Sequence, residues 1–272
     1  MTATSLAASA RKFPRSRAGH DNGNRLRGKR DSIFCLPETQ EAGIPDKERV
    51  LDPAAALAYY DWFGKKQDSQ GFYEDPAFDE LVAHSGFQDS RHVFEFGCGT
   101  GKFAARLFEK DLPPSADYTG CDISPVMVDL ARRRLEGYGE RVRIILSEGA
   151  VRFPLPDNSV DRVISCYVLD LLSKSDIGHF FSESLRVMIP GGRVCIASLT
   201  GGVSIPSRIV ASLWMAVFRL RPSLVGGCRP IHVDNFVNTR EWQVVNRRVV
   251  TPFGVPSEVL ILENKAATGN GL

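Results

Sequence analysis

The sequence lacks two features that would place it in common classes of protein. None of its six cysteines forms a C-x-x-C pair, a spacing typical of zinc sites and dithiol redox sites. No apolar run reaches the roughly 20 residues that a membrane-spanning helix needs. Four of the cysteines fall in or at the ends of expected strands, where a thiol packs as a small apolar group. We therefore expect buried free thiols, no disulfide, no bound metal and a reducing, cytoplasmic location.

Acidic residues are scarce at the start of the chain. Residues 1–30 hold eight Lys or Arg and one Asp, so the other 242 residues carry a net charge of −5 within an overall +2. A mildly acidic folded part does not favour nucleic-acid binding. Residues 1–48 are rich in Arg, Ser, Gly and Pro without periodicity and predict a disordered basic tail; 265–272 predict a second one. Such a start is also typical of an organellar transit peptide, which leaves a mitochondrial or plastid location as the alternative.

Two helix starts follow the basic tail. A capping Asp followed by Pro occurs at 52–53 and again at 75–76, and each predicts the first turn of a helix. The second helix should end at Gly86. Residues 49–90 therefore predict a helical segment, whose first helix carries the aromatic residues Tyr59, Tyr60 and Trp62.

A glycine-rich turn lies at the centre of the chain. Residues 93–104 read VFEFGCGTGKFA, which predicts a buried strand, a tight turn and the start of a helix. Glycines allow the sharp turn and the close approach of a ligand, and the helix start presents unpaired N–H groups. A dinucleotide-binding fingerprint would place its third glycine at Lys102, but the glycine is at Gly101. This spacing disfavours a dinucleotide.

The pattern G-x-G-x-G, with Glu95 two residues before it, resembles motif I of the class I S-adenosylmethionine (SAM)-dependent methyltransferases. A short strand at 118–122 then ends in Asp122, 21 residues after Gly101. A carboxylate at this strand end can accept hydrogen bonds from both ribose hydroxyls of an adenosine. The alternative is that Asp122 belongs to a helix cap ahead of Ser124.

The resemblance implies a cofactor site spread over several loops. Glu95 should face the methionine ammonium, and Asp122 the ribose. An acid after the third strand often binds the adenine amino group in this family; here Glu148 precedes Gly149, the reverse of the usual order. A Tyr-rich N-terminal helix often covers the cofactor, although packing on the sheet is the alternative. The expected cofactor-binding residues are Glu95, Gly97, Cys98, Gly99, Gly101, Asp122, Ile123, Met127, Glu148, Gly149, Ala150 and Cys166.

The fourth expected strand spans 161–165, and the turn after it limits which class of methyl acceptor is expected. Its residues are Ser165-Cys166-Tyr167-Val168, whereas methyltransferases acting on base nitrogens carry an Asp/Asn-Pro-Pro-aromatic sequence there. This argues against a base N-methyltransferase. Cys166 invites comparison with the nucleophile of cytosine C5 enzymes, but no neighbour in the sequence would lower its pKa, which favours a buried thiol.

The remaining sequence predicts the rest of an α/β fold. A helix at 176–189 ends at Pro-Gly-Gly before a strand at 193–198, and two further strands at 242–250 and 258–262 are joined as a hairpin. The resemblance implies a doubly wound, Rossmann-like sheet of seven strands, five parallel with an antiparallel C-terminal hairpin, between two layers of helices. The SAM-binding domain would span 91–264, with an insertion at about 200–240 that caps the acceptor pocket.

The function we expect is methyl transfer from SAM to a small molecule, with no nucleic acid as partner. The apolar stretch 208–220 carries Trp214, Met215 and Phe218, which favours a lipid-like or aromatic acceptor and leaves open a peripheral membrane contact; a dimer interface or core packing is the alternative. Other functional classes are an inactive SAM-binding regulatory module and an NAD(P)-dependent oxidoreductase. The acceptor-side candidates are Tyr60, Asp170 and His232.

Overall fold

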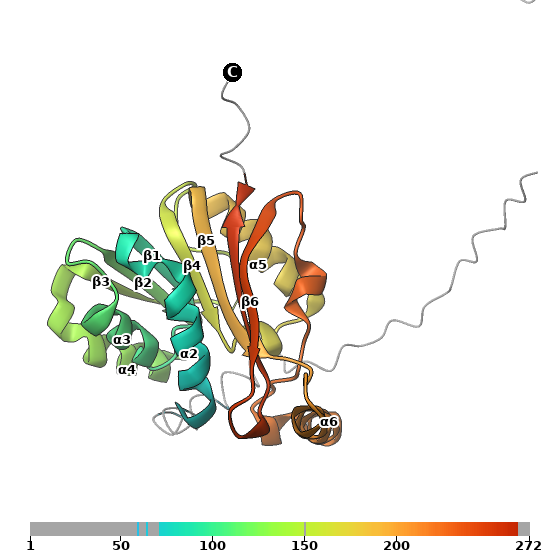
Figure 1. Cartoon of the computed structure of the whole chain (residues 1–272). Helices are drawn as coiled ribbons and strands as arrows, with labels where there is room; N and C mark the ends of the chain where they lie inside the picture. The colour runs from blue at the N-terminus through green and yellow to red at the C-terminus, as the bar shows by residue number, and fades with distance from the viewer. Residues whose placement is uncertain (1–58, 60–63, 65–70, 150, 266–272) are drawn as a thin grey trace, which may run out of the picture. The chain divides into compact units, whose positions relative to one another are not determined.

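The computed structural model describes Tyr59, Gly64 and residues 71–149 and 151–265, all within one compact unit, Lys47–Leu272. Three predicted segments lie outside the described residues: the tail at 1–48, the tail at 265–272 except Lys265, and most of the helix predicted from residue 53. Within the described part, seven strands form a single sheet in the order β3-β2-β1-β4-β5-β7-β6 (Figure 1). The predicted architecture is confirmed, since β1 to β5 pair in parallel and β7 is antiparallel to both β5 and β6.

Most elements begin and end within a few residues of their predicted bounds. The strands are β1 (His92–Phe96), β2 (Asp117–Asp122), β3 (Val142–Leu146), β4 (Val160–Cys166), β5 (Met188–Leu199), β6 (Trp242–Val250) and β7 (Ser257–Asn264). The helices are α2 (Gly71–Ser85), α3 (Lys102–Lys110), α4 (Pro125–Leu135), α5 (Lys174–Val187) and α6 (Ile205–Leu220). None of these helices is both long enough and apolar enough to cross a bilayer.

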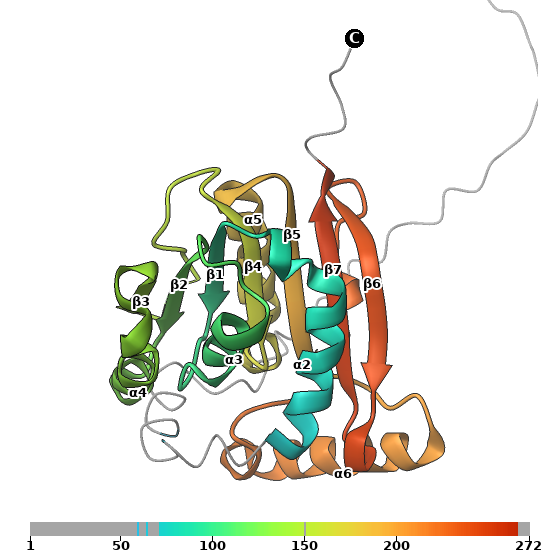
Figure 2. The same ribbon diagram turned by 60° about the vertical axis from the view of Figure 1, so that its left-hand side comes forward.

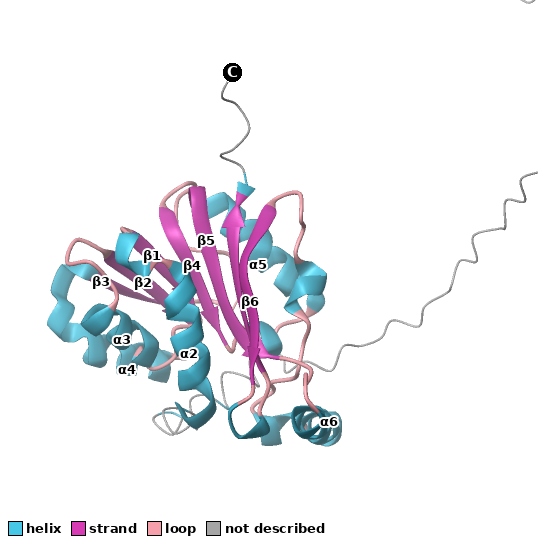
Figure 3. Ribbon diagram, in the orientation of Figure 1, coloured by secondary structure: helices cyan, strands magenta, loops and turns pink. Residues whose placement is uncertain are grey.

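Helices cover both faces of the sheet (Figures 2 and 3). Side chains alternate along a strand, so neighbouring residues of β1 belong to different cores. Val93 packs with the residues of α2, α3 and α4, whereas Phe94 and Phe96 pack on the other face with Phe180 of α5. The three layers follow from strands that are apolar on both sides.

Two predicted helix bounds were wrong. The second helix does not start at Asp75; α2 already begins at Gly71 and contains Pro76. Its extra turn carries Tyr73 and Glu74, both buried, so tertiary packing here overrides the local stop that proline predicts. The helix predicted at 176–189 is α5, which starts after the N-cap Ser173, and the Pro-Gly-Gly sequence falls inside β5.

Polar contacts fix α2 to the sheet at both its end and its middle. Arg162 of β4, buried to 8% exposure, donates hydrogen bonds to the carbonyl oxygens of Ser85 (2.9 Å) and Gly86 (2.7 Å). In the middle of α2, the Glu80 carboxylate accepts a hydrogen bond from Arg248 of β6 at 2.8 Å. These contacts position the first turns of α2 at the carboxyl ends of the parallel strands.

Replacing Arg162 with Ala should destabilise the fold. Two helix-end carbonyls would lose their partners in a buried place, at a cost of about 2–4 kcal/mol in the free energy of unfolding. Urea unfolding measures this. The matched control is Arg133→Ala, an exposed arginine of α4, for which we expect a change within about 0.5 kcal/mol. Equal effects of the two substitutions would contradict an anchoring role for Arg162.

Candidate active site at the carboxyl ends of the strands

The glycine turn after β1 folds over the end of β2. The N–H groups of Gly97 and Cys98 both donate to the carbonyl oxygen of Cys121, at 2.8 and 2.9 Å. Gly97, Gly99 and Gly101 all have positive φ, of 78°, 50° and 72°, a conformation that favours glycine. The turn therefore presents bare backbone at the carboxyl edge of the sheet.

Two of these glycines also make room for neighbouring elements. A Cβ on Gly97 would lie 2.3 Å from Cγ2 of Val168, in the segment after β4. A Cβ on Gly101 would lie 3.1 Å from Cα of Ala131 in α4, so this third glycine lets α3 and α4 pack closely. Gly101 does not line the cavity described below.

Asp122 lies at the end of β2 with its carboxylate turned toward the glycine turn. Oδ2 accepts from the N–H of Gly99 at 2.9 Å, and Oδ1 accepts from the N–H of Ser124 at 2.9 Å. The cap of α4 is Ser124, whose Oγ accepts from the N–H of Met127 at 3.2 Å. The N-cap residue is thus Ser124, and Asp122 contributes to this helix start through the hydrogen bond from the Ser124 N–H.

Glu95 is a buried acid on the floor of the site. Its side chain is in β1, 2% of the residue is exposed, and Tyr118 donates its hydroxyl hydrogen to Oε2. Burial raises the pKa of Glu95 to about 8, against the lowering effect of the Tyr118 hydrogen bond and with a further rise from Asp122. Near neutral pH the carboxyl group is thus largely protonated until a cation approaches it.

The segment after β4 holds a strained aromatic residue. Tyr167 has φ of 56°, unusual for a bulky side chain. Its N–H donates to the Ala197 carbonyl oxygen at 2.7 Å, its hydroxyl donates to Ser257 Oγ at 2.9 Å, and its ring meets that of Tyr73 edge to face at 5.5 Å. Contacts from three elements therefore fix the ring.

Cys166, the preceding residue, is not set up as a nucleophile. Removal from water raises the pKa of its thiol well above the ordinary value, with a smaller rise from Glu95. A thiol that stays protonated is unreactive, which is consistent with the interpretation of Cys166 as a structural group.

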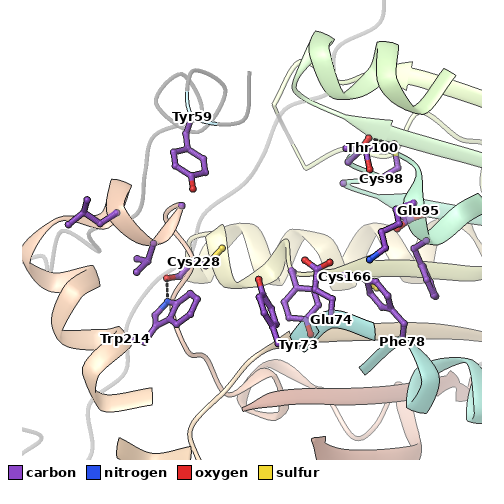
Figure 4. Close-up of a pocket in the computed structure, with 18 residues that line it drawn as sticks. Tyr59, Tyr73, Glu74, Phe78, Glu95, Cys98, Thr100, Cys166, Trp214 and Cys228 are labelled. Atoms are coloured by element: carbon purple, nitrogen blue, oxygen red, sulfur yellow. Dashed lines mark hydrogen bonds between the residues drawn. The ribbon is translucent and has the colours of Figure 1, made fainter. Parts of the chain in front are cut away.

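A single cavity of about 300 Å³ joins these parts (Figure 4). One end is formed by the glycine turn and the start of α3, and the other by the inner side of α6 and the turn after it, with Tyr59. Between the two ends lie residues of α2 and of the segment after β4. The lining residues are Tyr59, Tyr73, Glu74, Phe78, Glu95, Gly97, Cys98, Gly99, Thr100, Lys102, Phe103, Cys166, Tyr167, Trp214, Leu224, Val225, Gly226 and Cys228.

The cavity brings together part of the predicted cofactor set. Glu95, Gly97, Cys98, Gly99 and Cys166 line it. Among the others, Met127 is buried to 1% exposure in the core beneath α4, and Glu148 is exposed on the loop after β3. The predicted residues that do not line the cavity are Gly101, Asp122, Ile123, Met127, Glu148 and Gly149, and Ala150 lies outside the described residues.

The acceptor-side candidates are placed differently. Asp170 is fully buried; its Oδ2 accepts from the N–H of Leu199 at 3.2 Å, and Oδ1 has no hydrogen-bond partner in the described part of the chain. Burial raises the pKa of Asp170 to about 7, although Arg229 acts in the opposite direction. His232 is exposed and does not line the cavity, and Tyr60 lies outside the described residues.

Sequence reasoning missed several residues of the cavity. Tyr73 and Glu74 were not expected because the helix was predicted to begin after them, at the Asp-Pro pair. Both are buried and line the cavity. The only signal in the sequence is an aromatic residue and an acid directly before the predicted helix start. Among the described residues, no cluster of His, Cys, Asp and Glu could hold a metal ion.

Known proteins match the region that contains the site. Residues 93–192 match a family described as a methyltransferase domain. The demethylmenaquinone methyltransferase of Deinococcus radiodurans is 34% identical over 142 residues, 52% of this chain and 52% of the relative. The malonyl-[acyl-carrier protein] O-methyltransferase of Hahella chejuensis is 30% identical over 202 residues, 74% of this chain and 63% of the relative. The match thus spans about half the length of the first of these relatives.

Solved structures share the fold at low sequence identity. The cyclopropane synthase MmaA2 from Mycobacterium tuberculosis aligns with a TM-score of 0.59 at 14% identity, over 80% of this chain and 100% of that one. The N-methyltransferase NodS from Bradyrhizobium japonicum, in complex with S-adenosyl-L-homocysteine, aligns with a TM-score of 0.53 at 16% identity, over 70% of this chain and 87% of that one. The domain match over 93–192, which contains the glycine turn and the strand-end acid, and the methyltransferase names of these relatives support a class I SAM-dependent methyltransferase.

Proposed function

We propose that the protein transfers a methyl group from SAM to a small apolar or aromatic acceptor that enters the α6 end of the cavity. The observation that carries this proposal is the continuity of the cavity, which runs from the glycine turn to an aromatic wall. The curated relatives are named for acceptors as different as demethylmenaquinone and the malonyl group on an acyl carrier protein. The choice of acceptor class therefore rests on the lining of the cavity.

The residues at one end of the cavity fit SAM. The turn at Gly97 and Gly99 carries no side chain, so a ligand can approach its backbone. Glu95 would face the positively charged amino-acid part, and Asp122, beyond the turn, would accept the ribose hydroxyls. Ionisation of a buried acid is favoured by a cation beside it, so Glu95 and a cationic ligand stabilise each other.

The other end of the cavity fits an apolar acceptor. Tyr73 and Tyr167 meet at right angles, and Trp214 donates its indole N–H to the carbonyl oxygen of Cys228 at 3.0 Å, which leaves the ring itself as the wall. When bound, SAM supplies a methyl carbon that its sulfonium already makes electrophilic. The chain therefore has to orient the acceptor in line with that carbon and to exclude water, which rigid aromatic walls do.

Asp170 is the acceptor-side candidate that lies nearest this aromatic end. Burial raises the pKa of both Tyr73 and Tyr167, and the charge of Asp170 adds a small further rise, so Asp170 acts on both rings electrostatically. It does not line the cavity. We therefore assign it a positioning role through the two tyrosines, while direct proton transfer from a phenolic acceptor would need another group.

Asp122→Ala should weaken SAM binding by about 30-fold or more, because two charge-assisted hydrogen bonds to the ribose are lost. Isothermal titration calorimetry with SAM measures the affinity. The control is Asp129→Ala, an acid of α4 whose side chain is 62% exposed, which should bind SAM normally. Near-normal affinity of Asp122→Ala, with an unchanged melting temperature, would refute the assignment of the ribose site.

SAM affinity should rise with pH between about 6 and 7.5, by up to about tenfold per pH unit. Without a cation beside it, Glu95 is protonated below its pKa of about 8. A bound cation favours the ionised form, so binding of SAM releases a proton. The upper limit of pH 7.5 keeps the measurement below the ordinary pKa of an α-amino group, about 7.7–8.0, so that the amino group of SAM stays mostly protonated. Glu95→Gln should flatten the profile, and an equally steep profile in that variant would assign the proton to another group.

The acceptor end is tested by label transfer. Purified protein is incubated with methyl-labelled SAM and a cell extract, and the label is followed into lipid-soluble, aqueous and macromolecular fractions. We expect label in the lipid-soluble fraction, and a loss of at least about tenfold for Trp214→Ala at unchanged SAM affinity. Ser212→Ala, on the exposed side of α6, is the control. Label confined to the macromolecular fraction would exclude a small acceptor, and absence of transfer would favour a regulatory SAM-binding module.

A further inference from the structure

Helix α6 has two different faces. Its inward face packs on the domain through Ser207, Ala211 and Phe218, all buried, and adds Trp214 to the cavity lining. Its outward face is apolar and exposed, which is unusual for a surface helix. The residues of this face are Ile205, Ile209, Leu213 and Leu220, with exposed fractions of 75%, 55%, 63% and 86%. Their spacing of four, four and seven residues places them on one side of the helix.

The apolar surface continues beyond the helix. Leu224, in the turn that follows, is 66% exposed. Phe253, in the connection between β6 and β7, is 82% exposed and meets the ring of Phe72 at 5.7 Å. The connection contacts α6 directly, and both lie at the same end of the sheet (Figures 1 and 2). We call Ile205, Ile209, Leu213, Leu220 and Leu224 the apolar patch.

The charges on α6 and on the chain segments directly before and after it have one sign. Arg208, Arg219 and Arg221 are exposed on α6 or directly after it. The sequence contains no Asp or Glu between Glu183 and Asp234. A helix with an apolar outer face bordered by arginines and free of acids has the character of an interfacial helix that binds anionic lipids.

The apolar patch also borders the cavity. Leu224 is both exposed and part of the cavity lining, so the patch reaches the mouth of the cavity. Trp214 lines the cavity from the same helix that carries Ile209 and Leu213 of the patch. A molecule dissolved in a bilayer at the patch would therefore meet the aromatic end of the cavity.

We propose that α6 docks the protein on the surface of an anionic lipid bilayer, with the apolar patch at the level of the headgroups. A second copy of the chain is the other occupant to consider. A two-fold pairing through the same face would bring the arginines of both copies together without an acid to balance them. Anionic headgroups supply that balance, which is why the bilayer is the better match. The proposal does not depend on methyl transfer.

Sedimentation with vesicles tests the proposal on the full chain without SAM. We compare vesicles of phosphatidylcholine alone with vesicles that also contain phosphatidylserine. The protein should bind the anionic vesicles at least about tenfold more tightly. Ile209→Ser combined with Leu213→Ser should reduce this binding by tenfold or more, since both side chains would leave the lipid. Arg221→Glu should reduce it by about fivefold or more.

The control variant combines Val244→Ser with Val245→Ser on β6, where the two valines are 50% and 39% exposed. It should bind vesicles as the unchanged protein does. The basic segment 1–30 is present in every variant, so binding that persists in the Ile209/Leu213 variant would come from that segment and would overturn the proposal. Absence of binding to either kind of vesicle would overturn it too. So would a dimer in light scattering that the Ile209/Leu213 variant converts to monomer without any vesicle binding.

Discussion

The site depends on the hydrogen bonds that hold the glycine turn over the end of β2. The backbone N–H groups of Gly97 and Cys98 share the carbonyl oxygen of Cys121, and the N–H of Gly99 binds the carboxylate of Asp122. Three positions of this turn have positive φ, which glycine adopts without the steric cost of a Cβ atom. Because two neighbouring parallel strands end here, the turn joins their ends and leaves its outer side for a ligand.

The cavity that results combines two environments, one around a buried acid and one formed by aromatic rings. At the glycine turn, Glu95 is an acid held away from water, which disfavours its charge until a cation arrives. From the middle of the cavity to its α6 end, the rings of Tyr73, Tyr167 and Trp214 supply large rigid surfaces. A positively charged donor and an apolar acceptor can thus be held next to each other. Tyr167, which lines the cavity, has a strained backbone with φ of 56°.

Helices α2 and α6 complete the cavity from outside the common sheet. α2 is fixed to the sheet by Arg162 and carries Tyr73 and Glu74 into the lining. α6 contributes Trp214 on one face and carries an apolar surface on the other. A cavity wall and a surface for docking are thereby built from the same helix. This arrangement links the place where an acceptor is held to the surface from which it would come.

Much of the fold could be predicted from the sequence because its signals are local. Short apolar runs identify the strands, and the glycine turn predicts that a helix starts directly after it, where α3 begins. The acid at the end of β2 could likewise be placed beside the glycine turn, because parallel strands end at one edge. The start of α2 could not, since Pro76 is a local stop signal that burial of Tyr73 and Glu74 outweighs.

By itself, the sequence determined where most strands lie along the chain, the glycine turn and the acid at the end of β2, because backbone conformation and strand periodicity are properties of short segments. Only the tertiary structure decided which side chains share the cavity. Glu74, Tyr167 and Trp214 are far apart in the chain, and they meet because helix packing and sheet order bring them to the same edge.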